Sequence, residues 1–487
     1  MGDDKTEELR QRKKEARQSG GPERIAARRR KGIGSARERV LRLLDPETFV
    51  ELDVFVQGAV TGHGKVGGRD VYLFSLDGEV PQSALGEQFT RKIVKVIDLA
   101  ITNGAPLVGI YDGGGTWGRE PGKEGAAAVG CKEAASLGGD AGIFFRNVMA
   151  SGLIPQISAI MGPCAGAAVY SSAMADFAVV VKGGGYLFLG DPEALKAGTD
   201  NEASLEEIGG ARALSERSGV AHLAADDETE CLGMIRELLS FLPQNNLEET
   251  PPSGSSDPTD RMDEALGSLA VFESGGPYDV RDMVKHVVDE GDFLEIMPGW
   301  AKNLVIGFAR LGGRSVGIVA NQAAHLEGRL DLDASVKGAR FVRFCDAFNL
   351  PLVTFVDTPG FVPGEHQGHG RMVREAAKLM YAYCEATVPK LTVITHRAFA
   401  EGFEIMSSKH TRADFNFAWP SAQIGPGTPE RALDHRDSAS PYDAAAAGHL
   451  DDIIEPVTTR PRLVAALEAC ASKRESRPPK KHGNIPL

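Results

Sequence analysis

The sequence predicts an α/β protein built as a tandem duplication of one supersecondary plan. Three observations support this fold class. Short apolar runs that predict buried strands alternate with amphipathic segments that predict helices, a pattern typical of parallel sheets. Motifs of the first half recur in the second half at one constant offset. A polar segment rich in Pro, Gly and Ser, residues 244–260, separates the two halves.

The repeat is defined by three motif pairs that share an offset of 245 residues. These pairs are Val66–Val71 with Leu311–Val316, Pro106–Val108 with Pro351–Val353, and Asp112-x-x-Gly115 with Asp357-x-x-Gly360. A fourth pair, Ala175-Asp176-Phe177 and Ala413-Asp414-Phe415, recurs at an offset of 238 residues. Because separated motifs rarely share one offset by chance, we interpret the chain as a duplicated unit.

Both halves predict the same order of elements. A hairpin turns at Gly-Gly, an amphipathic helix follows, and a buried strand leads into an Asp/Gly loop before a further helix and strand. The predicted first helices and the two later strands of each half are 93–99 and 341–347, 107–111 and 352–356, and 156–161 and 390–395. Ligands bind beyond the carboxyl ends of parallel strands. The site is therefore predicted in the loops after Ile110, Met161, Val356 and Ile394.

The composition excludes several classes of protein. The 487 residues carry 54 Lys and Arg against 67 Asp and Glu, a net charge of −13, and 42% are hydrophobic. This balance is typical of a globular protein, and the acidic total argues against nucleic acid as a partner. No apolar run approaches the length of a membrane span, and the six cysteines form no C-x-x-C pair, which favours reduced thiols. We expect a cytoplasmic protein without a membrane partner.

Composition along the chain predicts four segments. Residues 1–20 form a charged arm, expected to be a solvated helix, and residues 246–276 form a linker. An N-terminal domain, 21–245, and a C-terminal domain, 277–487, account for the rest. Both domains have ordinary sizes.

Three short motif matches do not predict sites. Residues 62–67 fit G-x-G-x-x-G, but a strand follows where the dinucleotide motif needs a helix. Residues 122–124 (Gly-Lys-Glu) lack the upstream Gly and the Ser or Thr of a P-loop. His366 and His369 have no paired carboxylate helix, so we predict no metal site.

Two turns of small residues are the strongest signals for chemistry. Residues 161–168 lead from an apolar strand through small side chains into a helix, and Phe399–Phe403 is the counterpart that enters a helix-like run over 404–409. The first N–H groups of a helix have no internal partner, so such a turn can hold an oxyanion. A tightly packed strand–helix junction is the alternative interpretation, and the second turn favours the functional one. No Ser-His-Asp order or nucleophile elbow occurs, which is informative only if the chemistry needs no side-chain nucleophile.

These residues give the chain its resemblance to a family. It resembles the carboxyltransferase (β) subunits of biotin-dependent acyl-CoA carboxylases, nearest to the propionyl-CoA carboxylase β type. The shared motifs are Gly20–Arg24, Ala36–Arg39, Phe145–Val148, Ile160–Ala168, Ala320–Gln322, Phe341–Phe348, Asp357–Gly364, Met406–His410 and Arg477–Leu487. They are long and specific, and they span almost the whole chain.

The resemblance implies two crotonase-like (ClpP/crotonase) domains in a homohexamer. The N-domain would bind acyl-CoA, and the C-domain would receive carboxybiotin from a biotin carboxylase/carrier partner subunit. Backbone donors would do the catalysis, since biotin itself can take the α-proton. The resemblance assigns catalytic donors to Gly166, Ala167, Gly402 and Glu401, and substrate contacts to Gly114, Gly115, Ala165, Phe403 and Glu404. Losing one such donor typically raises the barrier by about 3–4 kcal/mol.

The chain departs from the family pattern at both turns. Ala167 stands where the family has Gly, and the loop after Asp112 differs and carries about a dozen extra residues within 116–135. The second turn reads Phe-Ala-Glu-Gly-Phe-Glu over 399–404, where the family reads Tyr-Gly-Gly-Ala-Tyr-Asp. A carboxylate at Glu401 would repel a developing oxyanion if it pointed inward, and would change little if it pointed to solvent.

Three functions stay open at this point. The first is a carboxyltransferase subunit with altered substrate preference. The second is a biotin-independent decarboxylase of a malonyl- or methylmalonyl-type thioester, which would keep only the first turn. The third is a non-catalytic assembly subunit. The sequence does not identify the acyl group, nor whether the thioester is on CoA or on an acyl carrier protein.

Overall fold

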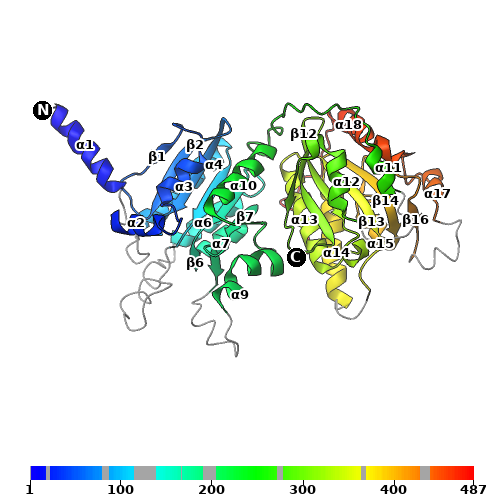
Figure 1. Cartoon of the computed structure of the whole chain (residues 1–487), viewed down its shortest axis with the longest axis horizontal. Coiled ribbons are helices and arrows are strands. Elements are labelled where there is room, and N and C mark those ends of the chain that lie inside the picture. Colours follow the sequence, from blue (N-terminus) through cyan, green and yellow to red (C-terminus); the bar gives the residue numbers. More distant parts are fainter. Residues whose placement is uncertain are drawn as a thin grey trace. The chain divides into compact units, whose positions relative to one another are not determined.

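The computed structural model describes residues 2–17, 22–78, 87–113, 139–165, 167–189, 204–270, 278–363, 369–427 and 439–486. The chain divides into two compact units, Met1–Asn246 and Leu247–Leu487. Each unit combines a mostly parallel sheet with helices (Figure 1). The prediction of an α/β fold is therefore confirmed.

Unit 1 contains a seven-stranded sheet in the order β1-β2-β3-β4-β5-β7-β9. Its strands are β1 (Val50–Leu52), β2 (Ala59–Val66), β3 (Arg69–Leu76), β4 (Leu107–Tyr111), β5 (Gln156–Ile160), β7 (Phe177–Val181) and β9 (Leu223–Ala225). β1, β2 and β3 pair antiparallel, and the pairs from β3 to β9 are parallel. Two short strands, β6 (Pro163–Ala165) and β8 (Tyr186–Phe188), form a separate parallel pair.

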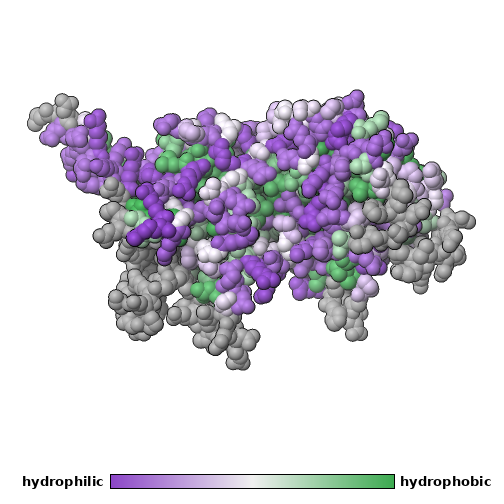
Figure 2. Space-filling view, viewed as in Figure 1, coloured by the Kyte–Doolittle hydropathy of each residue, from purple (hydrophilic) through white to green (hydrophobic). Residues whose placement is uncertain are grey.

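The helices of unit 1 begin with the charged arm. They are α1 (Gly2–Ala16), α2 (Pro22–Arg29), α3 (Ala36–Leu43), α4 (Glu87–Asn103), α6 (Gly139–Ala150), α7 (Ala167–Met174), α9 (Leu205–Gly209) and α10 (Glu228–Phe241), with a π-helical turn over Ala213–Arg217. Figure 2 shows the hydrophilic surface of α1. The core of the unit forms where apolar residues of α4, such as Ile93, Val96 and Ile97, meet the sheet.

Unit 2 repeats this plan with a sheet in the order β10-β11-β12-β13-β14-β15-β17, and β16 pairs with β14. Its strands are β10 (Phe293–Ile296), β11 (Leu304–Leu311), β12 (Arg314–Asn321), β13 (Leu352–Thr358), β14 (Lys390–Phe399), β15 (Phe415–Ala418), β16 (Gln423–Gly425) and β17 (Asp452–Ile453). The helices are α11 (Glu264–Ala270), α12 (Val280–Val287), α13 (Leu332–Ala347), α14 (His369–Glu385), α15 (Ala400–Ile405), α17 (Pro441–Ala446) and α18 (Thr459–Ala469). Short 3-10 turns cover Asp289–Gly291, Leu326–Gly328, Lys409–Thr411 and Pro456–Thr458.

Helix α11 lies inside the segment 246–276, which the sequence analysis assigns to a linker. Leu266 of this helix is fully buried in the core of unit 2, together with Met283 of α12 and Leu463 of α18. The packed part of unit 2 thus extends into that segment.

Two buried or half-buried ionisable side chains satisfy backbone groups at the two ends of β2 in unit 1. The carboxylate of Asp45 accepts hydrogen bonds from the amides of Gly67 and Gly68 at 3.1 and 2.8 Å, and Arg236 of α10 pairs with it at 2.8 Å. Both glycines have positive φ, which the tight turn requires. Lys92 of α4 donates to two backbone carbonyls at 2.8 and 2.6 Å.

Unit 2 repeats both devices. Asp289 accepts hydrogen bonds from the amides of Gly312 and Gly313 at 2.9 and 2.7 Å, and Arg460 of α18 pairs with it at 2.7 Å. Lys337 of α13 donates to three backbone carbonyls at 3.0, 2.8 and 3.3 Å. Lys92 and Lys337 are 245 residues apart. The duplication therefore extends from sequence motifs to matched polar contacts.

The described residues contain no helix that could span a membrane. Five of the six cysteines lie among them as free thiols.

Candidate active site

In unit 1 the loops after two neighbouring parallel strands lie against each other. The amide of Gly113, beyond β4, donates to the carbonyl of Pro163, beyond β5, at 2.9 Å. The amides of Met161 and Gly162 both donate to the carbonyl of Tyr111, at 3.0 and 3.1 Å. The predicted meeting of loops at the carboxyl edge of the sheet is thus present in the structure.

A buried hydrogen-bond chain fixes helix α7 behind the first turn. The Tyr111 hydroxyl and the Ser171 hydroxyl lie 2.9 Å apart, Ser171 donates to Asn147 at 2.9 Å, and the Asn147 amide donates to Gln156 at 3.0 Å. These residues belong to β4, α7, α6 and β5, so four elements are locked together. Such fully satisfied buried networks favour one arrangement of the backbone.

The first turn offers backbone groups and no activated thiol. Ala165 ends β6, and Ala167 is the first residue of α7. Burial raises the pKa of the nearby Cys164 thiol to about 12, so its reactive thiolate is disfavoured. The predicted donor Gly166, the predicted contacts Gly114 and Gly115, and the extra residues within 116–135 lie outside the described residues.

A buried carboxylate lies at the edge of this site. Asp112 is 1% exposed and pairs with Arg39 at 2.7 Å and with Arg28. Burial opposes its ionisation, but the charges of Arg39 and Arg28 outweigh burial and lower the pKa of Asp112. Two glycines make room for this carboxylate, since a Cβ at Gly162 or Gly78 would lie 2.2 or 2.4 Å from its Oδ1.

In unit 2 the turn itself begins the helix. Helix α15 starts at Ala400 and ends at Ile405, so the predicted helix-like run over 404–409 is wrong in its bounds. The helix ends early because Ser407 has a φ of 53°, which no α-helix accommodates. Ala400 also has a positive φ, 50°, an unusual value for a residue with a Cβ.

Gly402 brings α15 into close contact with the loop after β13. A Cβ at Gly402 would lie 2.8 Å from Gly360 Cα and 3.1 Å from Thr358 Cγ2. The Thr358 hydroxyl in turn donates to the Gly360 carbonyl at 3.1 Å. The second turn therefore packs directly on the Asp/Gly loop of its own unit.

Strand register shows that the two turns are equivalent. The last pairs of β6 with β8 and of β14 with β16 are Ala165 with Phe188 and Phe399 with Gly425. Ala167 and Glu401 each lie two residues beyond these positions. Each turn follows a short parallel pair and opens a helix, which is the arrangement that an oxyanion site needs.

The side chains of the second turn differ in exposure. Glu401 and Glu404 are exposed, whereas Phe403 is half-buried. The Phe403 ring meets the rings of His410 and His449 edge-on, at centroid distances of 6.0 and 6.4 Å. An exposed Glu401 retains its backbone N–H in the turn while its carboxylate stays hydrated.

The sequence analysis missed the charges that neutralise the two buried carboxylates. Asp112 uses Arg28 and Arg39, whereas its counterpart Asp357 uses Arg397 at 2.8 Å. The available signal was the repeated Asp of the Asp-x-x-Gly motif, because a buried carboxylate needs a cation. The motif does not show which arginine supplies it.

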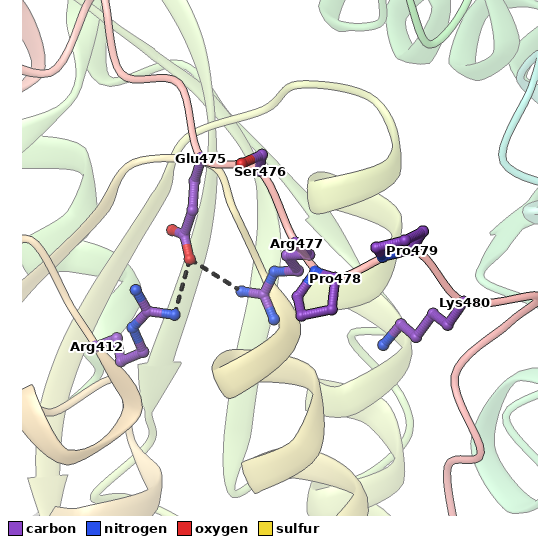
Figure 3. Close-up of a pocket in the computed structure, with 7 residues that line it drawn as sticks. All are labelled: Arg412, Glu475, Ser476, Arg477, Pro478, Pro479 and Lys480. Carbon is purple, nitrogen blue, oxygen red and sulfur yellow. Dashed lines mark ion pairs between the residues drawn. The ribbon is translucent and has the colours of Figure 1, made fainter.

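A pocket of about 290 Å³ lies elsewhere in unit 2, under the C-terminal segment (Figure 3). Arg412, Glu475, Ser476, Arg477, Pro478, Pro479 and Lys480 line it. Glu475 pairs there with Arg412 at 2.9 Å and with Arg477 at 3.6 Å. No predicted site residue lines this pocket. Within the described ranges, no group of three His, Cys, Asp or Glu residues could hold a metal ion.

Comparisons with known proteins agree on one family. The carboxyl transferase domain family matches residues 27–435 and 430–485. The chain is 44% identical to the carboxyltransferase subunit of propionyl-CoA carboxylase from Haloferax mediterranei, over 100% of this chain and 99% of that protein. It is also 44% identical to the methylmalonyl-CoA decarboxylase subunit alpha from Veillonella parvula, over 99% of each chain.

A solved structure shows the same fold. The transcarboxylase 12S hexamer with hydrolysed methylmalonyl-coenzyme A bound matches with a TM-score of 0.92 and 38% identity, over 99% of this chain and 98% of that one. The predicted duplication of a crotonase-like unit is thereby confirmed. Because the family pattern covers nearly all residues and the relatives align end to end, the chain belongs to the carboxyl transferase family.

Proposed function

We propose that this chain is a carboxyltransferase subunit that moves a carboxyl group between carboxybiotin and the α-carbon of an acyl-CoA. The observation that carries the proposal is the pair of equivalent strand–turn–helix sites, one in each unit, in a family of carboxyl transferases. Removing the α-proton of a thioester creates an enolate oxyanion. Backbone N–H groups at a helix start stabilise such an anion without any side-chain nucleophile.

The first turn is assigned to the acyl thioester. We propose that the amides of Gly166 and Ala167 hold the thioester oxygen as the enolate forms, with Ala165, Gly114 and Gly115 around the acyl group. The hydrogen-bond chain from Tyr111 to Gln156 keeps α7 in place. A propionyl-CoA type of substrate is supported by the propionyl-CoA carboxylase relatives and by the methylmalonyl-coenzyme A in the transcarboxylase structure.

The second turn is assigned to biotin carried on a partner biotin carboxylase/carrier subunit. Biotin supplies the carboxyl group and a base for the α-proton. The residues fit this group, because the Phe399 side chain gives no cap to α15 and Phe403 offers a half-buried aromatic face. The amides of Glu401 and Gly402 would meet the ureido oxygen, and Glu404 lies at the rim. The exposure of Glu401 supports the interpretation in which its carboxylate points to solvent.

A homohexamer is supported by an apolar face that α6 of unit 1 leaves exposed. This face is formed by Phe145, Val148 and Met149, which are 60%, 55% and 48% exposed. Large exposed apolar side chains at helical spacing mark interaction surfaces. We expect Phe145→Glu to lower the molecular mass measured by light scattering.

A cytoplasmic location accords with the free thiols.

One observation favours decarboxylation, the reaction of the second candidate: the Veillonella relative is named a methylmalonyl-CoA decarboxylase subunit. That name does not bear on whether biotin takes part, so biotin independence is left to the assay. The two reactions use the turns differently. Carboxyl transfer to biotin needs both turns, whereas decarboxylation of a malonyl-type thioester needs only the first. The carboxyltransferase is preferred because the family model and the propionyl-CoA carboxylase relatives favour it.

The deciding assay follows thioester mass with malonyl-CoA and methylmalonyl-CoA, with and without free biotin. Ala167→Pro removes one donor at the first helical position, where proline is tolerated. Gly402→Val blocks the second turn. A carboxyltransferase loses biotin-dependent transfer in both variants. Decarboxylation without biotin that survives Gly402→Val would instead establish the decarboxylase. If neither variant alters any thioester reaction, the chain is an assembly subunit.

A further inference from the structure

We propose that Asp357, Arg397 and His396 form a positioning cluster that sets the second turn for the biotin side of the reaction. The inference rests on the proposed carboxyltransferase function and adds residues that the backbone-donor scheme does not include. None of the three is placed in contact with substrate. They act through the backbone that carries the turn.

A bulge in β14 brings an arginine and a histidine to one carboxylate. Val356 pairs with Ile394 and Thr358 pairs with Ala398, so three residues of β14, 395–397, lie opposite the single residue Asp357. Bulges of this kind re-aim side chains and are frequent next to active sites. Without the bulge, His396 and Arg397 would alternate to opposite faces of the strand.

The Asp357 carboxylate is buried, and its partners Arg397 and His396 are partly exposed. This carboxylate is 1% exposed and accepts from Arg397 Nε at 2.8 Å and from the Arg397 amide at 3.2 Å. His396 Nδ1 lies 3.6 Å from the same oxygen. Arg397 also donates to the Glu327 carbonyl at 3.0 Å. Burial opposes ionisation of Asp357, but His396 and Arg397 outweigh it and lower the pKa of this carboxyl.

This carboxylate controls both partners of the contact at the turn. On one side, Arg397 lies two residues before Phe399 and three before Ala400, where α15 begins. On the other side, Asp357 directly precedes Thr358 and lies three residues before Gly360, and Gly402 packs against both of these residues. Moving Arg397 away from Asp357 would therefore shift the donors relative to the loop that faces them.

Unit 1 neutralises its buried carboxylate with residues from other elements. The register of β6 and β14 makes Gly162 the counterpart of His396 and Pro163 the counterpart of Arg397. Neither can supply a cation, and Asp112 is neutralised from the N-terminal helices α2 and α3. Only in unit 2 does the strand that leads into the turn also supply the cation, Arg397, that neutralises the buried carboxylate. The cluster is thus specific to the biotin side.

The test compares Arg397→Met and Arg397→Lys with Arg261→Met. Arg261 is a matched control, since it is 26% exposed and pairs with Asp257 at 2.6 Å, against 20% and 2.8 Å for Arg397. Transfer from methylmalonyl-CoA to free biotin is measured with the full chain. We expect Arg397→Met to lower kcat/KM for biotin about 10- to 100-fold, the effect of a misplaced reacting geometry. KM for methylmalonyl-CoA should stay unchanged, and Arg397→Lys should restore part of the activity.

A second readout does not depend on activity. Hydrogen exchange of the amides in 399–405 should accelerate in Arg397→Met and not in Arg261→Met. Equal KM changes for both substrates, or unchanged exchange in a folded Arg397→Met, would overturn the positioning role. A wild-type chain that transfers nothing to biotin would refute the proposed function instead, and the exchange comparison would still decide the cluster.

Discussion

Replacing Gly402 by Ala tests the packing of the second turn on the loop after β13. The added Cβ would lie 2.8 Å from Gly360 Cα, a backbone atom that cannot swing aside as the end of a flexible side chain can. Overpacking of this kind destabilises by about 1–3 kcal/mol. Gly→Ala within a helix stabilises by about 1 kcal/mol. We therefore expect Gly402→Ala to lie between neutral and about 2 kcal/mol destabilised.

Gly233→Ala is the matched control. Gly233 lies inside α10, and a Cβ there would meet nothing within 4 Å, so only the helix term of about 1 kcal/mol remains. Urea unfolding at one fixed protein concentration measures both variants, because assembly shifts apparent stability. Transfer to free biotin should fall in Gly402→Ala alone. Equal stabilisation by the two variants, with transfer intact, would refute the close approach of α15 to Gly360.

Four further predictions follow from the described contacts. Arg39→Met removes the cation that pairs with both buried carboxylates, Asp112 and Glu228, and should lower the unfolding free energy of unit 1 by about 3–5 kcal/mol in chemical unfolding; a loss below about 1 kcal/mol would show that Arg28 alone is enough to neutralise Asp112. Ala400→Gly relieves a left-handed residue, worth about 1–2 kcal/mol, against about 0.4–1 kcal/mol of added chain entropy, so a rise in melting temperature is expected. Glu401→Gln should change kcat by less than about tenfold, because the carboxylate is exposed and the N–H is kept; a larger gain would place the carboxylate in the site. Burial lowers the pKa of Lys337 from 10.5 to about 7, so the unfolded chain binds a proton that the folded chain lacks between these values. The unfolding free energy of the wild type therefore rises with pH in that window, by up to about 1.4 kcal/mol per pH unit, whereas Lys337→Met lacks this contribution. The unfolding free energy of wild type minus that of Lys337→Met should become more positive from pH 7 to 10.

The sequence predicts the strands of the site closely and the charges around it not at all. β4 spans the predicted 107–111, because a run of buried residues there is bounded by Pro106 and Asp112. β14 runs beyond the predicted 390–395 to Phe399, since a bulge and a second partner strand prolong it. Periodicity detects apolar faces. It carries no information on a bulge or on an arginine that arrives from another element.

Comparing the two units separates what the fold requires from what the site permits. Two pairs of side chains make the same contacts in both units. The carboxylates Asp45 and Asp289 accept from amides of the Gly-Gly turns, and the lysines Lys92 and Lys337 donate to backbone carbonyls, so each satisfies polar backbone groups that the shared fold leaves without a backbone partner. At the carboxyl edge the fold requires only that the buried Asp be neutralised. One unit draws that charge from helices that precede its sheet, and the other draws it from the strand that enters the turn. Divergence of chemistry between two copies of one plan is therefore expected at this edge, where Glu401 and Ala400 replace the glycines of the family pattern.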